Sequence, residues 1–178
     1  MTFNLEKIIK AIVKYFDFPI EFRVEKVEKP EFNFGELYVF YQLDEPDRHV
    51  VIKYVDDIMD LKDYEKSMYN RLGIFLENAG YGENKEYLQV MLTLHEFGHV
   101  DYVLKMEAAN SVGKYNVVNE CAKDVAAISF SPDRMMKLRE EGVDIPYMLR
   151  GDEMYADAFA MKYFIPVINI LREKGLVE

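Results

Sequence analysis

The sequence predicts an α+β fold in which a small antiparallel sheet in the N-terminal third packs on a set of helices. Three observations lead to this prediction. Apolar side chains recur at helical spacing over the first sixteen residues, alternate with polar ones in three runs between residues 20 and 54, and return to helical spacing from Asp57 onward. No repeat, low-complexity run or flexible linker interrupts the chain, so residues 1–178 predict a single domain.

The first predicted helix covers residues 4–16, and Pro19 marks its exit. Its apolar side chains, spaced three or four residues apart, are Leu5, Ile8, Ile9, Ile12, Val13 and Phe16. We expect this face to lie against the core.

The three alternating runs predict strands. Their inward-facing candidates are Ile20, Phe22 and Val24; then Leu37, Val39 and Tyr41; and last Val50, Ile52 and Tyr54. The segment Asp44-Glu45-Pro46-Asp47 has turn chemistry, so we expect the last two strands to form a hairpin and the sheet to be antiparallel.

The rest of the chain predicts helices. Gly80 and Gly82 help to end the first of them, Ser131-Pro132 is an N-cap and first-turn pair, and Pro166 predicts a bend or break in the last. The predicted helices span about 58–75, 88–106, 117–130, 131–142, and from Gly151 toward Leu171.

Composition limits the classes of function. The net charge of −10, from 32 acidic and 22 basic residues, disfavours nucleic-acid binding and docking on anionic lipid. No apolar run is long enough to cross a bilayer, and the N-terminus lacks the pattern of a signal peptide. The single Cys121 fits a reducing compartment, so we expect a cytoplasmic protein without membrane insertion. Abundant Glu, Lys, Ile and Tyr favours a thermophilic source.

The segment His95-Glu96-Phe97-Gly98-His99 has the pattern H-E-x-x-H inside a strongly periodic helix. Residues four apart share a helix face, so both imidazoles can reach one ion. Zinc–nitrogen distances are about 2.0–2.1 Å. Glu96, one position along, can reach a water on the metal without being a ligand, which predicts His95 and His99 as zinc ligands and Glu96 as catalytic base.

A catalytic zinc needs a third protein ligand and leaves one position for water. The metzincin pattern would place Gly and His at positions 102 and 105, but the chain has Tyr102 and Lys105, which excludes that class. The third histidine, His49, lies in the strand region without spacing that ties it to the site. We expect it to be a core or surface histidine, with a role toward substrate or oxyanion as the alternative.

We favour Glu153 as the third ligand. It shares a helix face with Asp157, which could accept the free ring N–H of a ligating histidine. Ala156 and Ala160 are small and four apart, so this helix could approach the histidine helix closely. The rival ligands are Glu140, Glu141, Asp152 and Asp157.

H-E-F-G-H followed by E-M-Y-A-D resembles the gluzincin pattern of zinc metallopeptidases. The string E-M-Y-A-D-A-F-A-M-K-Y-F-I-P, residues 153–166, is similar to the ImmA/IrrE-like peptidases and to the soluble minigluzincins. The resemblance implies a zincin-like helical core, with His95, His99 and Glu153 as ligands, Glu96 as base and Asp157 as supporting acid. It covers about twenty residues.

Two features depart from that pattern. The gap between His99 and Glu153 is longer than the ImmA/IrrE-like group usually has, and no histidine follows Glu153. The downstream histidine that assists several gluzincins is therefore missing. The candidates to replace it are Tyr147, Arg150, Tyr155 and Tyr163.

The function predicted is a zinc-dependent metalloendopeptidase that hydrolyses a protein or peptide substrate through a metal-activated water and a glutamate base. The alternatives are a zinc-binding regulatory or autoinhibited pseudo-peptidase acting by protein interaction, and a metal-free helical interaction protein.

Overall fold

The structure is a computed structural model and describes residues 3–28, 37–42, 46–55, 70–82, 84–110 and 151–178. The order of elements is α1 (Leu5–Phe16), β1 (Glu21–Lys26), β2 (Leu37–Gln42), β3 (His49–Tyr54), α3 (Asn70–Asn78), α4 (Lys85–Asn110) and α7 (Gly151–Glu173). This confirms the α+β class. The helices predicted at 117–130 and 131–142, the first part of the helix from residue 58, and Cys121 lie outside the described residues.

Helix α1 confirms the first predicted helix. Asn4 caps it by accepting a hydrogen bond from the Lys7 backbone N–H at 2.9 Å, and Asp17 ends it in the left-handed conformation with φ of 48°. Its buried face consists of Leu5, Ile8, Ile9 and Ile12. Helix α1 thereby fixes one wall of the core.

The sheet is mixed, so the prediction of an antiparallel sheet was wrong in part. Strand β3 lies in the centre, antiparallel to β2 and parallel to β1, with Glu21 opposite His49 and Lys26 opposite Tyr54. The β2–β3 hairpin has the expected direction, whereas β1 skips β2 to pair with β3. Alternation in a sequence fixes which face of a strand is buried, but not its neighbours or their directions.

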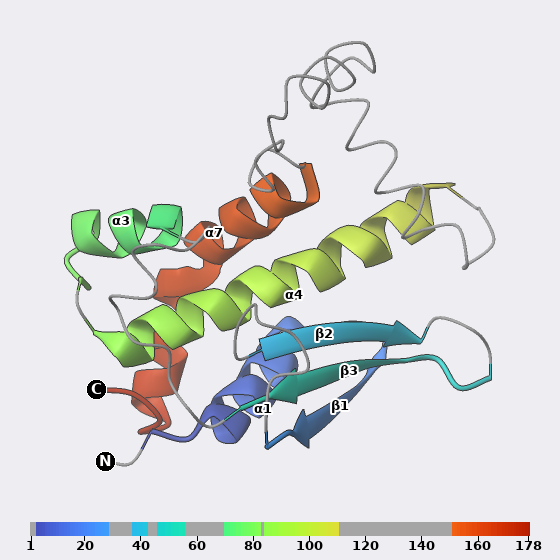
Figure 1. Ribbon diagram of the computed structural model, residues 1–178, viewed down its shortest axis with the longest axis horizontal. Helices are drawn as coiled ribbons and strands as arrows, with labels where there is room; N and C mark the ends of the chain where they lie inside the picture. The colour runs from blue at the N-terminus through green and yellow to red at the C-terminus, as the bar shows by residue number, and fades with distance from the viewer. Residues whose placement is uncertain (1–2, 29–36, 43–45, 56–69, 83, 111–150) are drawn as a thin grey trace, which may run out of the picture.

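Figure 1 shows α4 running through the middle of the molecule, with α7 and α3 along one side and the sheet on the other. Helix α1 contacts β1, α4 and α7. One core cluster joins these elements, and its largest fully buried side chains include Phe97, Phe164, Met91, Leu94, Ile52 and Leu171. Among the described helices, none is both long and apolar enough to cross a membrane.

Helix α7 passes through Pro166 as one helix, so the chain does not break there. A proline removes one helical hydrogen bond. Pro166 faces solvent, while Phe164, Val167 and Ile168 beside it are buried and hold the helix against the core. Packing therefore outweighs the local disruption.

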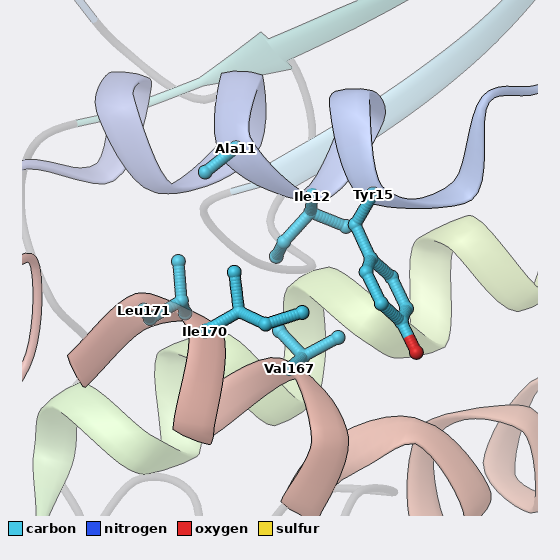
Figure 2. A pocket seen from close by; sticks show the side chains of 6 residues that line it. All are labelled: Ala11, Ile12, Tyr15, Val167, Ile170 and Leu171. Atoms are coloured by element: carbon cyan, nitrogen blue, oxygen red, sulfur yellow. The ribbon is translucent and has the colours of Figure 1, made fainter. Parts of the chain in front are cut away.

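A small apolar pocket lies where α1 crosses the second half of α7 (Figure 2). Its lining residues are Ala11, Ile12, Tyr15, Val167, Ile170 and Leu171. Val167 is about four turns along α7 from Glu153, so this pocket is remote from the predicted metal ligands.

The closest approach of α4 to α7 is at Gly98. A Cβ atom placed there would lie 2.6 Å from the Cα of Ala156 and 3.0 Å from its carbonyl oxygen. Both neighbours are backbone atoms, so a side chain at position 98 would force the two helices apart. The absence of a side chain on Gly98 is what permits their packing distance.

We expect Gly98→Ala to lower the free energy of unfolding by about 1–3 kcal/mol through overpacking. In an exposed helix the same substitution would stabilise the protein by about 1 kcal/mol, because alanine has the higher helix propensity. Here we expect the steric effect to be the larger of the two. Urea denaturation measures the difference. Asn169→Ala, at an exposed position of α7, is the control and should change stability by no more than about 0.5 kcal/mol. A Gly98→Ala protein as stable as the wild type would contradict the steric argument.

Candidate metal centre

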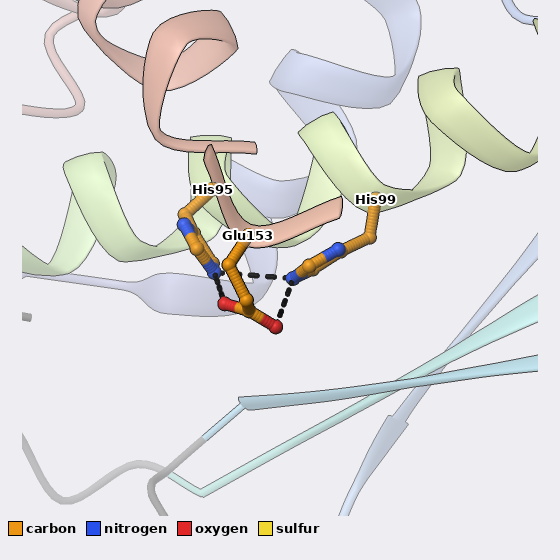
Figure 3. Close-up of side chains that lie close together, drawn as sticks. All are labelled: His95, His99 and Glu153. Carbon is orange, nitrogen blue, oxygen red and sulfur yellow. Dashed lines mark hydrogen bonds and ion pairs between the residues drawn. The ribbon is translucent and has the colours of Figure 1, made fainter. Parts of the chain in front are cut away.

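Three predicted metal ligands converge between α4 and α7. His95 and His99 project from the same face of α4, and Glu153 reaches them from the first turn of α7 (Figure 3). The two Nε2 atoms are 3.1 Å apart. The Glu153 carboxylate lies 3.2 Å from Nε2 of His95 and 3.4 Å from Nε2 of His99. These three side chains could hold a metal ion.

Asp157 lies behind His95, one turn along α7 from Glu153. Its Oδ1 accepts a hydrogen bond from Nδ1–H of His95 at 3.0 Å. Because a carboxylate is only an acceptor, Nδ1 must carry the proton. When the ring is neutral, the other nitrogen, Nε2, presents its lone pair toward His99 and Glu153, which is the state a metal ligand needs.

The centre is buried on its α7 side and open toward His99. His95 is 0% exposed, Glu153 2% and Asp157 6%. The side chain of His99 retains 17% of its accessible surface. Solvent therefore reaches the centre on the side of His99, while the carboxylates stay in the protein interior.

The protonation of His95 is governed by its acidic neighbours. Burial lowers its pKa, but the hydrogen bonds with Asp157 and Glu153 outweigh this effect and raise the pKa to about 9. In the metal-free protein His95 is therefore a cation at neutral pH, with its second ring proton directed at Glu153. A metal ion must displace that proton, so metal binding releases it.

Glu96 follows His95 on α4 and is half-buried. Burial raises the pKa of its carboxyl, and the positive charges of His99 and His95 partly oppose the rise. These interactions show that Glu96 shares the electrostatic environment of the centre. Like Asp157, Glu96 is an acid of this cluster that is not among the three candidate ligands.

His49 does not belong to this site. Side chains alternate along β3, so His49 shares a face with Val51 and Lys53. Val50 and Ile52 are buried on the opposite face, and His49 therefore points to the outer face of the sheet. Its Nε2 lies 3.2 Å from Nη1 of Arg23, and its Nδ1 lies 2.9 Å from the carbonyl oxygen of Asp47. His49 is itself buried, at 8% exposed, and these contacts hold it away from the candidate metal centre, which agrees with the default prediction of a core or surface histidine.

The other residues that the sequence offered as a third ligand or as a replacement for the downstream histidine lie elsewhere or outside the described residues. Tyr163 packs its ring on Phe16 and Phe159 in the aromatic core, with centroids 5.0 and 4.6 Å apart. The Tyr155 hydroxyl bonds Asp101 and Lys105 of α4. The remaining ones lie outside the described residues or side chains: Glu140, Glu141, Tyr147, Arg150 and Asp152.

Sequence reasoning did not single out Asp101 or Lys105. Their spacing of four on one helix indicates only an ordinary surface ion pair, and the bond to Tyr155 joins positions 54 residues apart. No local pattern could have revealed that contact.

No family model matches the chain, and no characterised protein or solved structure matches it. What the site can do must therefore be argued from its own geometry.

We expect the metal-free protein to lose stability as pH rises from about 6.5 to about 9. The pKa of His95 is about 9 in the folded state and 6.5 when unperturbed, so the folded form binds the proton more tightly. That contribution is fully present below the unperturbed value and is lost as pH passes through the folded value. Urea denaturation in chelator at several pH values measures it.

The matched variant is His95→Asn, in which this dependence should flatten. If wild type and His95→Asn showed the same pH dependence of stability between pH 6 and 9, the pairing of His95 with the two carboxylates would not carry the effect.

Proposed function

We propose that the protein is a zinc-dependent peptidase of gluzincin type. The observation that carries the proposal is the convergence of His95, His99 and Glu153, with Asp157 on the outer nitrogen of His95 and Glu96 beside the group. Residues from two distant parts of the chain meet with the donor types that a catalytic zinc requires.

The spacing of the ligand atoms fits zinc. Ligands about 2.0–2.1 Å from a tetrahedral ion lie roughly 3.3–3.4 Å from one another. The corresponding distances are 3.1 Å between the imidazole nitrogens, and 3.2 and 3.4 Å from these nitrogens to the carboxylate. Two imidazoles and one carboxylate leave a fourth position for water or substrate, as in catalytic rather than structural zinc sites.

Zinc, when bound, would lower the pKa of a water molecule and polarise the scissile carbonyl. Glu96 acts as the general base: its carboxylate takes the proton of the attacking water and returns it to the leaving amine. Burial raises the pKa of the Glu96 carboxyl, which makes its carboxylate a stronger base than that of an exposed glutamate. Asp157 keeps His95 in the tautomer that presents Nε2.

The substrate proposed is an extended segment of a protein or peptide. β2 is an edge strand of the described sheet and contacts α4, the helix that carries the base. An extended peptide adds readily to such an edge through backbone hydrogen bonds. We therefore assign substrate binding to the β2 edge rather than to β1, which lies on the other side of β3.

The family likeness supports the same assignment. The pairing of H-E-F-G-H with E-M-Y-A-D, the string that resembles the ImmA/IrrE-like peptidases and minigluzincins, is the pairing that brings Glu153 and Asp157 to the histidines. A cytoplasmic location, a thermophilic source and the absence of nucleic-acid binding stay predictions from composition.

The test is Glu96→Gln. We expect this variant to bind stoichiometric zinc, because His95, His99 and Glu153 are intact, and to lose at least about 100-fold in the rate of cleavage of an unfolded protein substrate, because general-base catalysis is worth that much. Metal analysis and a peptidase assay are run on both proteins.

Glu86→Gln is the control, with the same substitution on the same helix in its first turn, away from the histidines. It should retain full activity. Zinc-loaded wild type that cleaves no unfolded substrate would favour a regulatory zinc protein, and wild type without stoichiometric zinc would refute the metal centre itself.

A further inference from the structure

The proposed ligand Glu153 lies in the first turn of its helix. Helix α7 begins at Gly151, and the backbone N–H groups of a first turn have no partner within the helix. Its neighbour Met154 is 55% exposed and gives this turn little packing. The position of Glu153 therefore depends on side chains that tie the turn to α4.

One such tie is a network of three polar side chains beside the metal centre. The Tyr155 hydroxyl donates a hydrogen bond to Oδ2 of Asp101. Nζ of Lys105 donates to the same oxygen at 2.6 Å and to the Tyr155 hydroxyl at 2.7 Å. Each member of the network thus contacts the other two.

The network connects the two backbone segments that carry opposing metal ligands. Asp101 follows His99 by two residues on α4, and Tyr155 follows Glu153 by two residues on α7. The Tyr155 ring also lies 5.2 Å from the ring of Tyr102 on α4. The hydrogen bond between Tyr155 and Asp101 joins residues that are 54 positions apart in the sequence. It lies beside the place where Glu153 comes within 3.4 Å of His99.

The network stays intact across neutral pH. Burial and the hydrogen bond to Asp101 raise the pKa of the Tyr155 hydroxyl, so it remains a donor. The Asp101 carboxylate and the Tyr155 hydroxyl raise the pKa of Lys105, so it remains a cation. The side chain of Asp101 is only 16% exposed, so its bond to Tyr155 is shielded from water better than an ordinary surface contact.

We propose that Tyr155 is a positioning residue of the metal centre: its hydroxyl, bound by Asp101 and Lys105, holds Glu153 at ligand distance from His99. The inference rests on the proposed metal function, because it assigns a role toward the same ion. Loss of the hydroxyl leaves the first turn of α7 free to move, which weakens the third ligand and leaves the His95–His99 pair unchanged.

The experiment compares Tyr155→Phe with Tyr163→Phe. The first removes the hydroxyl and keeps the ring beside Tyr102. The second makes the same change about three turns further along α7 from Glu153. Zinc affinity is measured by competition with a chromophoric chelator. We expect affinity to fall about tenfold in Tyr155→Phe, the range found for groups that orient metal ligands, and to stay unchanged in Tyr163→Phe.

A second readout separates positioning from general stability. The visible spectrum of the cobalt-substituted protein reports the ligand geometry, and it should change in Tyr155→Phe although urea unfolding of the metal-free form is little altered. Asp101→Ala, which removes the acceptor of the Tyr155 hydroxyl, should reproduce the affinity loss. The Tyr155→Phe/Asp101→Ala double variant should lose no more zinc affinity than the weaker-binding single variant, because both substitutions remove the same hydrogen bond. If Tyr155→Phe fails to fold, Asp101→Ala alone carries the test.

The outcomes distinguish the two proposals. Wild type that binds zinc tightly, with the same affinity and cobalt spectrum in Tyr155→Phe, overturns the positioning role and leaves the peptidase proposal standing. Zinc-loaded wild type without peptidase activity, but with the affinity loss in Tyr155→Phe, overturns the enzyme and supports the positioning role. Wild type that binds no zinc overturns both.

Discussion

The contact between Gly98 and Ala156 is the constraint on which the site depends. His95 and His99 lie on α4, while Glu153 and Asp157 lie on α7, and none of these side chains is long enough to meet its partners across helices spaced by large residues. Because Gly98 lacks a side chain, the backbone of α7 lies so near that a Cβ atom at position 98 would be 2.6 Å from the Cα of Ala156. The 3.0 Å bond between His95 and Asp157 and the two contacts of Glu153 follow from that approach.

Burying these ionisable side chains costs free energy unless they pair with one another. Two carboxylates and an imidazole, each less than a tenth exposed, lie between α4 and α7, where Gly98 also packs against Ala156 and Phe159. Burying charges of one sign together disfavours their ionised forms, so a positive charge is needed between them. In the metal-free protein the proton on His95 supplies it, and a divalent ion supplies more. The same clustering of carboxylates would favour a cation bound between them.

The parts of the site that could be predicted are those encoded by local spacing. His95 and His99, and likewise Glu153 and Asp157, are four residues apart on helices whose apolar period was evident, and the resemblance to gluzincins joined the two halves. The direction of β1 could not be read, because an alternating strand fits a parallel or an antiparallel neighbour equally well. Nor could the link from Tyr155 to Asp101, since a contact over 54 residues leaves no periodic trace. The outer-face position of His49 follows from strand parity once the buried residues of β3 are known.

The separation of the ligands along the chain has a consequence for biogenesis. His95 and His99 become adjacent as soon as one turn of α4 forms, whereas the acid that pairs with His95 is 62 residues further on. During synthesis the ribosome therefore releases a helix with two imidazoles side by side well before the C-terminal carboxylates emerge. Closing a loop of this length costs conformational entropy that only the docking of α7 can offset. The candidate metal centre is therefore complete only after α7 has been made and has docked on α4.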